Sequence, residues 1–162
     1  LENSNLPENN KELLEMWRNN IAVLNTAEND REDENFVRDI ENAARLVGIT
    51  LEIAGNLPTD NNAVARVLTF ATLQCLNNAA RHAKADKMLL ESFDDGENYI
   101  FKFKNNGRKP PRKINEGGGL SSVRKKAEQI GGSMKILTSE NFVLEITIPK
   151  SEVLQYDKSA DS

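Results

Sequence analysis

The sequence predicts a two-layer α/β sandwich, in which a mixed or antiparallel sheet carries its helices on one face. The first observation is the order of the expected elements: helix, strand, long helix, two paired strands, long loop, helix and two paired strands. The second is that helices and strands do not alternate strictly, as they would in a doubly wound parallel sheet. The third is size, because 162 residues that are 38% hydrophobic fit one compact domain.

The first half of the chain supplies two helices and one strand. Residues 36–47 present one apolar helical face, and Gly48 stands where a C-terminal helix cap is expected. The alternation of residues 49–53 predicts a strand. Turn residues then lead to a candidate N-cap and a long helix from residue 62 to about residue 83.

The next two strands form a predicted hairpin. Residues 88–93 and 99–103 are rich in strand-forming side chains, and residues 94–98 between them have the composition of a turn. Residues 105–119 show no periodicity and combine prolines, glycines and basic residues, which predicts a long mobile loop. Long loops inside compact domains are often functional.

The last part of the chain supplies a helix and two more paired strands. An apolar stripe over residues 120–130 predicts the helix, which a pair of glycines closes. Strands are expected over residues 134–138 and 142–148. Residues 151–162 are predicted to be a disordered tail, so the folded domain spans residues 31–150.

The leading segment, residues 1–30, contains a predicted helix of its own. Leu14, Trp17, Ile21 and Leu24 are spaced 3, 4 and 3 residues apart, which is the step of a coiled-coil seam. The same pattern is typical of an amphipathic helix that packs on its own domain, and both interpretations remain open.

Composition limits the classes of partner and compartment. The net charge is −4, from 21 basic and 25 acidic residues, so no global positive field attracts nucleic acid. The lone Cys75 favours a reducing, cytoplasmic compartment. No apolar run approaches the length of about 20 residues that a membrane span requires. We therefore expect a soluble part of a longer protein that binds anions locally.

Two segments combine into a predicted phosphate site. Gln74, Asn78 and either Arg81 or His82 fall at i, i+4 and i+7 or i+8, which collects amides and cations into one polar stripe on an apolar helix. The run Gly117-Gly118-Gly119-Leu120 opens a second helix, where free backbone N–H groups and the helix dipole suit a phosphate. Together they predict a nucleotide site.

With these elements in place, the chain resembles the catalytic and ATP-binding domain of bacterial sensor histidine kinases. That family belongs to the ATPase superfamily that also contains DNA gyrase and MutL. The segment 73–85 is similar to the asparagine box of the nitrate-sensor and DesK-like subfamily. Gln74 takes the place of the family's Glu, Asn78 that of its Asn, and Arg81 and His82 that of its basic pair.

Two further landmarks carry the resemblance. Residues 105–109 correspond to the family's Asp-x-Gly-x-Gly box, although Asn105 replaces the adenine-reading Asp and Lys109 the second Gly. Gly107 would let the chain turn tightly beneath the base, or supply the positive φ of a turn. The run 117–120 matches the Gly-x-Gly-Leu box, and residues 131–134 and 146–149 also resemble the family.

The resemblance implies a Bergerat-type ATP-binding fold and a site for Mg-ATP. Asn78 is the expected Mg²⁺ ligand, because a hard ion takes an amide oxygen together with phosphate oxygens and water. Gln74 stands at the catalytic position. Arg81, His82 and Asn105 are expected to contact the nucleotide together with Gly107 and the run 117–120. Asn105 keeps an oxygen that can accept from the adenine amine but lacks the charge of an Asp, which predicts weaker ATP affinity.

The resemblance also implies partners that lie outside this chain. The γ-phosphoryl group would pass to a histidine on an upstream dimerisation domain, and from there to a response regulator. The full-length protein would then be a homodimer in the cytoplasm or anchored to a membrane. No histidine precedes His82, so this chain alone is not expected to autophosphorylate. Two alternatives are a degenerate interaction module without phosphotransfer and an anti-sigma-type serine kinase of the same superfamily.

Overall fold

The computed structural model describes residues 33–109 and 118–152. The predicted leading helix, Gly117 and most of the predicted tail lie outside these residues. The helices and strands follow the predicted order closely. They are α2 (Asp33–Leu46), β1 (Thr50–Ala54), α3 (Asn62–Asn78), the π-helical turn η1 (Ala79–Ala83), β2 (Lys87–Asp94), β3 (Asn98–Asn105), α4 (Gly118–Gln129), β4 (Ser133–Leu137) and β5 (Val143–Pro149).

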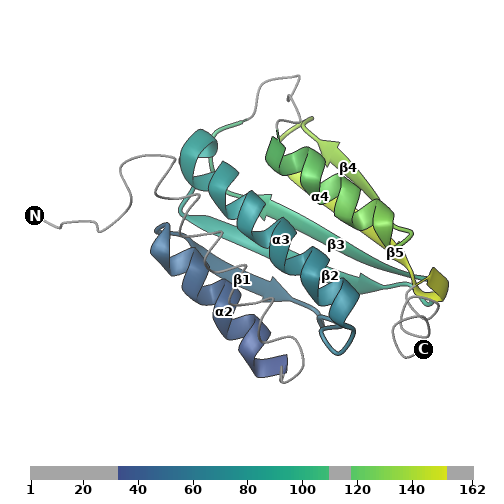
Figure 1. Cartoon of the computed structure of the whole chain (residues 1–162). Coiled ribbons are helices and arrows are strands. Elements are labelled where there is room, and N and C mark those ends of the chain that lie inside the picture. The colour runs from purple at the N-terminus through teal and green to yellow at the C-terminus, as the bar shows by residue number, and fades with distance from the viewer. Residues whose placement is uncertain (1–32, 110–117, 153–162) are drawn as a thin grey trace, which may run out of the picture.

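The five strands in the described part of the chain form one mixed sheet in the order β1-β2-β3-β5-β4. β1 pairs with β2 in parallel, and the other three neighbouring pairs are antiparallel. The three α-helices of the described residues lie on one face of this sheet, with α3 between α2 and α4 (Figure 1). The predicted two-layer α/β sandwich is therefore confirmed.

The core lies between α3 and the sheet. α3 is buried along most of its length because it has a helix on each side and the sheet beneath it. Two buried threonines in it, Thr69 and Thr72, donate their hydroxyl groups to the carbonyl four residues earlier, at 2.8 and 2.6 Å. Phe101 and Phe103 are fully buried on the inner face of β3, and Tyr99 on the same face is half-buried, because side chains alternate between the two faces of a strand.

The long helix differs from the prediction in its last turn. A single α-helix was expected to about residue 83, but the α-helix ends at Asn78 and continues as the π turn η1. A tertiary contact accounts for this difference. The N–H of Arg108 donates to the Ala83 carbonyl at 2.7 Å, and Gly107 packs directly on Ala83. Hydrophobic periodicity reports which face is buried and carries no information about such a contact.

The predicted loop and tail are shorter than expected at their described ends. Asn105 is the last residue of β3 and pairs with Met88 of β2, and Gly118 and Gly119 belong to the first turn of α4. The predicted disordered tail was placed from Ser151, but Ser151 lies in a helical turn.

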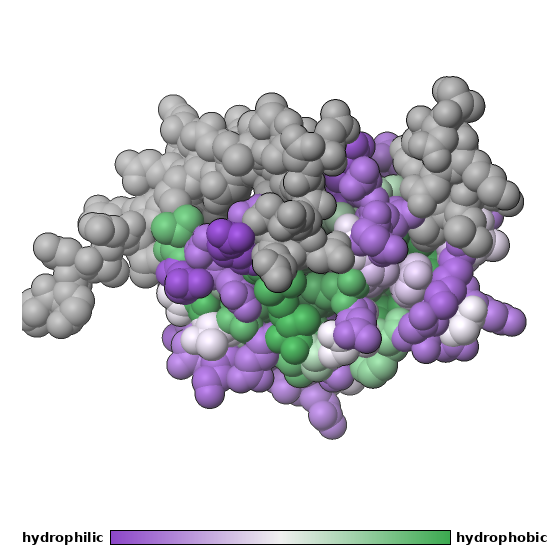
Figure 2. Space-filling view, turned by 90° about the horizontal axis from the view of Figure 1, so that it is seen from below, coloured by the Kyte–Doolittle hydropathy of each residue, from purple (hydrophilic) through white to green (hydrophobic). Residues whose placement is uncertain are grey.

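Figure 2 views the molecule from the side of α2 and β1, where apolar side chains are visible between polar ones. Among the described large apolar residues, Leu46, Phe93 and Leu137 are the exposed ones, and they belong to three different elements. Scattered exposed apolar side chains are ordinary on a protein surface. None of the described helices has the length and apolar character needed to cross a bilayer.

Candidate functional site

The two predicted motifs meet where α3 runs beside the first turn of α4 (Figure 1). A side chain at Gly119 would collide with Oε1 of Gln74, so the glycine permits this close approach. Gln74 is half-buried and lies one helical turn before Asn78. The structure thus brings the asparagine-box helix and the glycine run together, as the nucleotide-site prediction requires.

The polar stripe continues to Asn78 and then changes. Asn78 is the last residue of α3, whereas Arg81 and His82 lie on η1, so they do not extend the stripe at α-helical spacing. Asn78 and Arg81 are half-buried, and His82 is exposed. The side chains of these three residues make no hydrogen bond or ion pair with any described residue. They are therefore available to a ligand, and π-helical turns are frequent at functional sites.

A tight contact between η1 and the segment after β3 forms one wall of the site. A Cβ on Gly107 would lie 2.6 Å from the Cβ of Ala83 and 2.8 Å from its carbonyl carbon. Gly107 is not among the described glycines with positive φ, so the alternative role considered for it, the positive φ of a turn, is wrong. The close approach to Ala83 is what excludes a side chain there.

Asn105 and Asn106 use their amides in different ways. Oδ1 of Asn105 accepts a hydrogen bond from the N–H of Gly107 at 2.9 Å. Oδ1 of Asn106 accepts from the N–H groups of Asp86 and Lys87 at 3.1 and 3.0 Å, and its Nδ2 donates to Asp86 at 2.5 Å. Sequence reasoning gave Asn106 no role. Through these bonds Asn106 holds the segment after β3 next to the turn that leads into β2.

Two buried residues, Cys75 and Asn77, lie in the last turn of α3 just before Asn78. Asn77 is 7% exposed, and its Oδ1 has no hydrogen-bond partner in the described structure. A buried polar atom without a partner is costly, which marks this position as unusual for a core residue. Sequence analysis did not single out Asn77. Cys75 is a free, buried cysteine, and burial raises the pKa of its thiol.

The first turn of α4 offers backbone groups to an anion. Gly118 and Gly119 belong to it, and Gly117 lies outside the described residues. Leu120 is 6% exposed and packs in the core, so its side chain does not face a ligand and only its N–H group is a candidate contact. The free N–H groups and the dipole of this 12-residue helix favour negative charge at this end.

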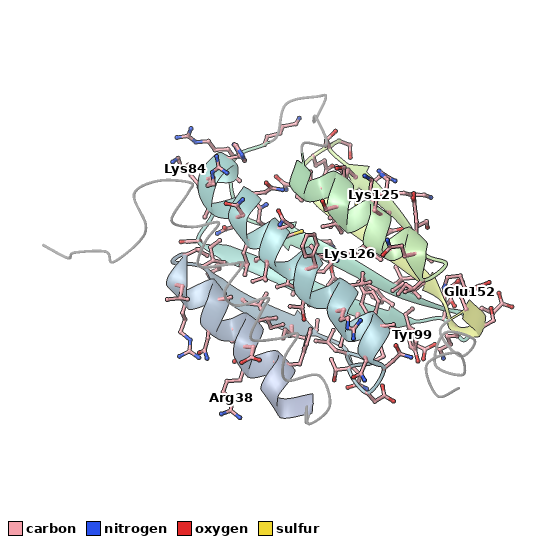
Figure 3. The ribbon with its side chains drawn as sticks, viewed as in Figure 1. Arg38, Lys84, Tyr99, Lys125, Lys126 and Glu152 are labelled. Carbon is pink, nitrogen blue, oxygen red and sulfur yellow. The ribbon has the colours of Figure 1, made fainter. Side chains whose placement is uncertain are left out.

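Contacts along α4 fix its position relative to the rest of the domain. The guanidinium of Arg124 donates to the Met134 carbonyl at 2.7 Å, and Nζ of Lys126 lies 4.9 Å from the centre of the Phe70 ring on α3. Figure 3 shows Lys126 between α4 and α3, and Lys84 at the end of η1. Lys84 has φ of 54°, a left-handed conformation that is strained for a residue with a side chain.

The donor set of the site suits Mg²⁺ only together with phosphate. Among the described residues, no group of three or more His, Cys, Asp or Glu side chains is arranged to hold a metal. The amide of Asn78 supplies one hard oxygen, and no described residue competes for it. Mg²⁺ retains several waters and readily takes phosphate oxygens, so one amide oxygen fits its requirements.

Comparison with known proteins defines the fold more narrowly. No model of a known protein family matches the chain, and no curated protein sequence matches it either. Among solved structures, the chain is similar to the histidine kinase domain of the Erythrobacter litoralis blue-light activated histidine kinase EL346, with 19% identity and a TM-score of 0.58. The match covers 74% of this chain and 61% of that one, so this chain spans less than two thirds of its length.

Two further solved structures agree with this match. The Acinetobacter baumannii histidine kinase AdeS matches at 15% identity and a TM-score of 0.52, over 84% of this chain and 76% of that one. The catalytic domain of the histidine kinase ThkA matches at 21% identity and a TM-score of 0.53, over 72% of this chain and 92% of that one. The chain therefore has the fold of histidine kinase catalytic domains.

Proposed function

We propose that residues 31–150 form the nucleotide-binding, phosphoryl-donor domain of a sensor histidine kinase. One observation carries the proposal: on this fold, Gln74 of α3, one helical turn before Asn78, lies against Gly119 in the glycine run of α4. The amide and the cations around that meeting point lack partners among the described residues. The N-terminus of α4 favours negative charge, and polar side chains without partners beside it favour a charged ligand over a purely structural role.

Each residue has a proposed role in holding Mg-ATP. Asn78 would bind Mg²⁺ through its amide oxygen, and the bound ion would neutralise charge on the phosphates. The N–H groups of Gly117, Gly118, Gly119 and Leu120 would donate to phosphate oxygens, with Arg81 adding positive charge and His82 a ring N–H donor. Asn105 and Gly107 would lie against the base.

Gln74 would act by position and not as a base. An amide cannot accept a proton at neutral pH, so this chain should activate water poorly and hydrolyse ATP slowly. Phosphoryl transfer to a histidine depends mainly on positioning and charge neutralisation. The contact between Gln74 and Gly119 supports such a positioning role, because it couples the asparagine-box helix to the start of α4.

The remaining parts of the proposal concern partners and location. The phosphoacceptor histidine would lie on an upstream dimerisation domain of the same protein, and a response regulator would receive the phosphoryl group. The nitrate-sensor and DesK-like subfamily is proposed from the segment 73–85. A cytoplasmic location is proposed because the lone cysteine, Cys75, is a free thiol in the core.

A second candidate function is a degenerate module that regulates a partner without transferring phosphate. The departures at Gln74, Asn105 and Lys109 from the family pattern favour it. Mg²⁺-dependent nucleotide binding separates the two candidates, because a degenerate module has no need to retain it.

The test is isothermal titration of the purified chain with non-hydrolysable ATP and GTP analogues, with and without Mg²⁺. We expect binding that strengthens with Mg²⁺, and a loss of about tenfold or more in Asn78→Ala, since hydrogen bonds to charged groups contribute about 1.5–3 kcal/mol. Asn62→Ala, an exposed position at the other end of α3, is the matched control. If Asn78→Ala binds the ATP analogue with the affinity of the unmodified chain, the proposed position of the site is wrong. No binding at millimolar analogue would favour the degenerate module.

A further inference from the structure

One face of helix α3 changes from exposed to buried along its length. Five residues follow one another at intervals of 4, 4, 3 and 4, so they share a face: Asn62, Arg66, Phe70, Leu73 and Asn77. Asn62 and Arg66 are exposed, which identifies this as the face turned away from the sheet, and Phe70 is half-buried. Leu73 is 1% exposed and Asn77 is 7% exposed. The second half of an outward face is therefore covered.

The described helices and strands do not account for this cover. Figure 1 views the helix layer with the sheet behind it. In this view α2 and α4 lie on either side of α3, and no described helix or strand lies in front of it. Oδ1 of Asn77 is buried without a hydrogen-bond partner in the described structure, as expected under an apolar surface that excludes water and offers no donor.

Three stretches of the chain lie outside the described residues, and the leading one has the matching chemistry. Residues 1–32 include the predicted seam of four apolar side chains at residues 14–24. Residues 110–117 hold a single large apolar side chain, Ile114. Residues 153–162 follow Glu152, which packs on Gly131 beyond the C-terminal end of α4, whereas Gln74 lies at the N-terminal end of that helix.

We propose that the leading segment docks on the second half of the outward face of α3, with its apolar seam against Phe70 and Leu73. A helix as short as this seam is marginal alone in water, so it needs a surface on which to pack. A surface on the same chain is favoured over a second copy, because a short linker holds the segment at an effective concentration of roughly millimolar. The proposal goes beyond nucleotide binding and does not depend on it.

The connection to the folded domain is long enough for this contact. Eight residues, 25–32, join the seam to the start of α2 at Asp33. Fully extended, they span about 26–29 Å. Helix α2 lies beside α3, and the 17 residues of α3 are about 25 Å long (Figure 1). The segment can therefore reach the level of Leu73.

The experiment uses Trp17, which is the only tryptophan of the chain and lies on the seam. Acrylamide quenching of its fluorescence is measured in the purified chain, in the native state and in urea, over a range of chain concentrations. We expect Trp17 to be quenched less in the native chain than in urea. We also expect this protection to be independent of concentration, because the contact forms within one molecule.

Matched variants of α3 locate the surface. Leu73→Gln puts a polar side chain under the docked segment and should raise the quenching of Trp17 toward its value in urea. Arg66→Gln gives the same side chain on the same face, outside the covered half, and should leave the quenching unchanged. Circular dichroism melting curves verify folding. Where Leu73→Gln does not fold, Asn77→Lys makes the test, since an ammonium group is costly to bury under an apolar surface.

Each outcome decides the proposal. Trp17 that is quenched as readily in the native chain as in urea would overturn it. Protection that falls on dilution, together with dimers in analytical ultracentrifugation, would overturn it in favour of a seam that pairs with a second copy. Protection that persists in a folded Leu73→Gln or Asn77→Lys variant would place the segment on another surface and overturn it. None of these results bears on nucleotide binding, which the titration with ATP analogues tests separately.

Discussion

The two ends of helix α3 each carry a buried asparagine, and the two asparagines differ in their hydrogen bonding. Asn61 at the N-terminus and Asn77 near the C-terminus are each 7% exposed. Oδ1 of Asn61 caps the helix by accepting from the N–H of Val64 at 3.0 Å, whereas Oδ1 of Asn77 has no partner in the described structure. Beyond Asn77 the helix widens into a π turn and ends at Lys84 in a left-handed conformation. The N-terminal end has a hydrogen-bonded cap that stabilises the helix, whereas the C-terminal end carries an unpaired buried oxygen and a strained backbone conformation.

The ends of the sheet repeat this contrast. In the β2–β3 turn, Asp94 pairs with Lys150 at 2.6 Å, and Asp95 accepts from the N–H groups of Glu97 and Asn98 at 2.9 and 2.7 Å. At the opposite end of β3, the Asn105 amide has a single hydrogen bond to a described residue, the one that its Oδ1 accepts from Gly107. Unsatisfied and strained groups persist in proteins mainly where function requires them. The unpaired oxygen of Asn77 and the left-handed Lys84 lie at the same end of α3, and this supports the proposed site there without any sequence motif.

The largest change in the free energy of unfolding should come from the contact between Gly107 and Ala83 that forms one wall of the site. Gly107→Ala places a Cβ against the backbone of Ala83, which cannot move without breaking the bond from Arg108. We expect the free energy of unfolding to fall by about 3 kcal/mol, the upper part of the range for overpacking. Urea denaturation of the variant and the unmodified chain measures the difference.

Gly96→Ala in the β2–β3 turn is the control for that measurement. No atom lies within 4 Å of the added Cβ, and only the φ of +94° is unfavourable. The expected loss is about 1 kcal/mol from the left-handed backbone alone. Equal losses for the two alanine variants would remove the basis for a tightly packed wall at Ala83.

A matched pair of substitutions tests the contrast between the ends of α3. Asn61→Ala removes the cap and should lower the free energy of unfolding by about 1 kcal/mol. Asn77→Ala removes an unpaired buried oxygen and introduces a better helix former, so it should raise that free energy by about 0.5 kcal/mol. Thermal and urea unfolding measure both changes. If Asn77→Ala lowers the free energy of unfolding as much as Asn61→Ala does, the unpaired Asn77 does not destabilise the C-terminal end of α3.

Sequence reasoning predicted the fold because the fold depends on patterns that local sequence carries. The alternation around Phe101 and Phe103 reports the buried face of β3, and Gly48, with φ of 75°, ends the first helix as expected. It also identified the two motifs that meet at Gln74 and Gly119. Both kinds of prediction rest on residues that are close together in the chain, or on a resemblance that fixes their order.

The features it missed arise from contacts between segments distant in the chain. The π turn depends on the bond between Arg108 and Ala83, and the role of Asn106 depends on Asp86, 20 residues earlier. The direction of the Asn105 amide depends on the N–H of Gly107, which the sequence alone does not orient. Hydrophobic periodicity predicts which residues are buried and whether a segment is a helix or a strand. Hydrogen-bond partners from different segments can be identified only once the backbone is folded.

The strain at the end of η1 predicts a smaller effect. Lys84→Gly should raise the free energy of unfolding by up to about 1 kcal/mol, because glycine adopts a φ of 54° without steric cost. Lys84→Ala is the matched control, since it removes the same charge but keeps a Cβ in the left-handed conformation. A gain of equal size in both variants would attribute the effect to the charge and not to the backbone.

The smallest effect is the loss of stability at low pH that comes from the ion pair in the β2–β3 turn. The bond to Lys150, and after it the N–H of Gly96, lowers the pKa of Asp94, so the stability that this carboxylate contributes is present above about pH 4 and is lost as the pH falls through the lowered pKa. Melting temperatures measured from neutral to acidic pH should fall less steeply in Asp94→Asn. Lys150→Met should flatten the acid limb in the same way, because it removes the partner. If Asp94→Asn melts in parallel with the unmodified chain at every pH, the pairing in the β2–β3 turn contributes nothing to stability, and the contrast would then rest on α3 alone.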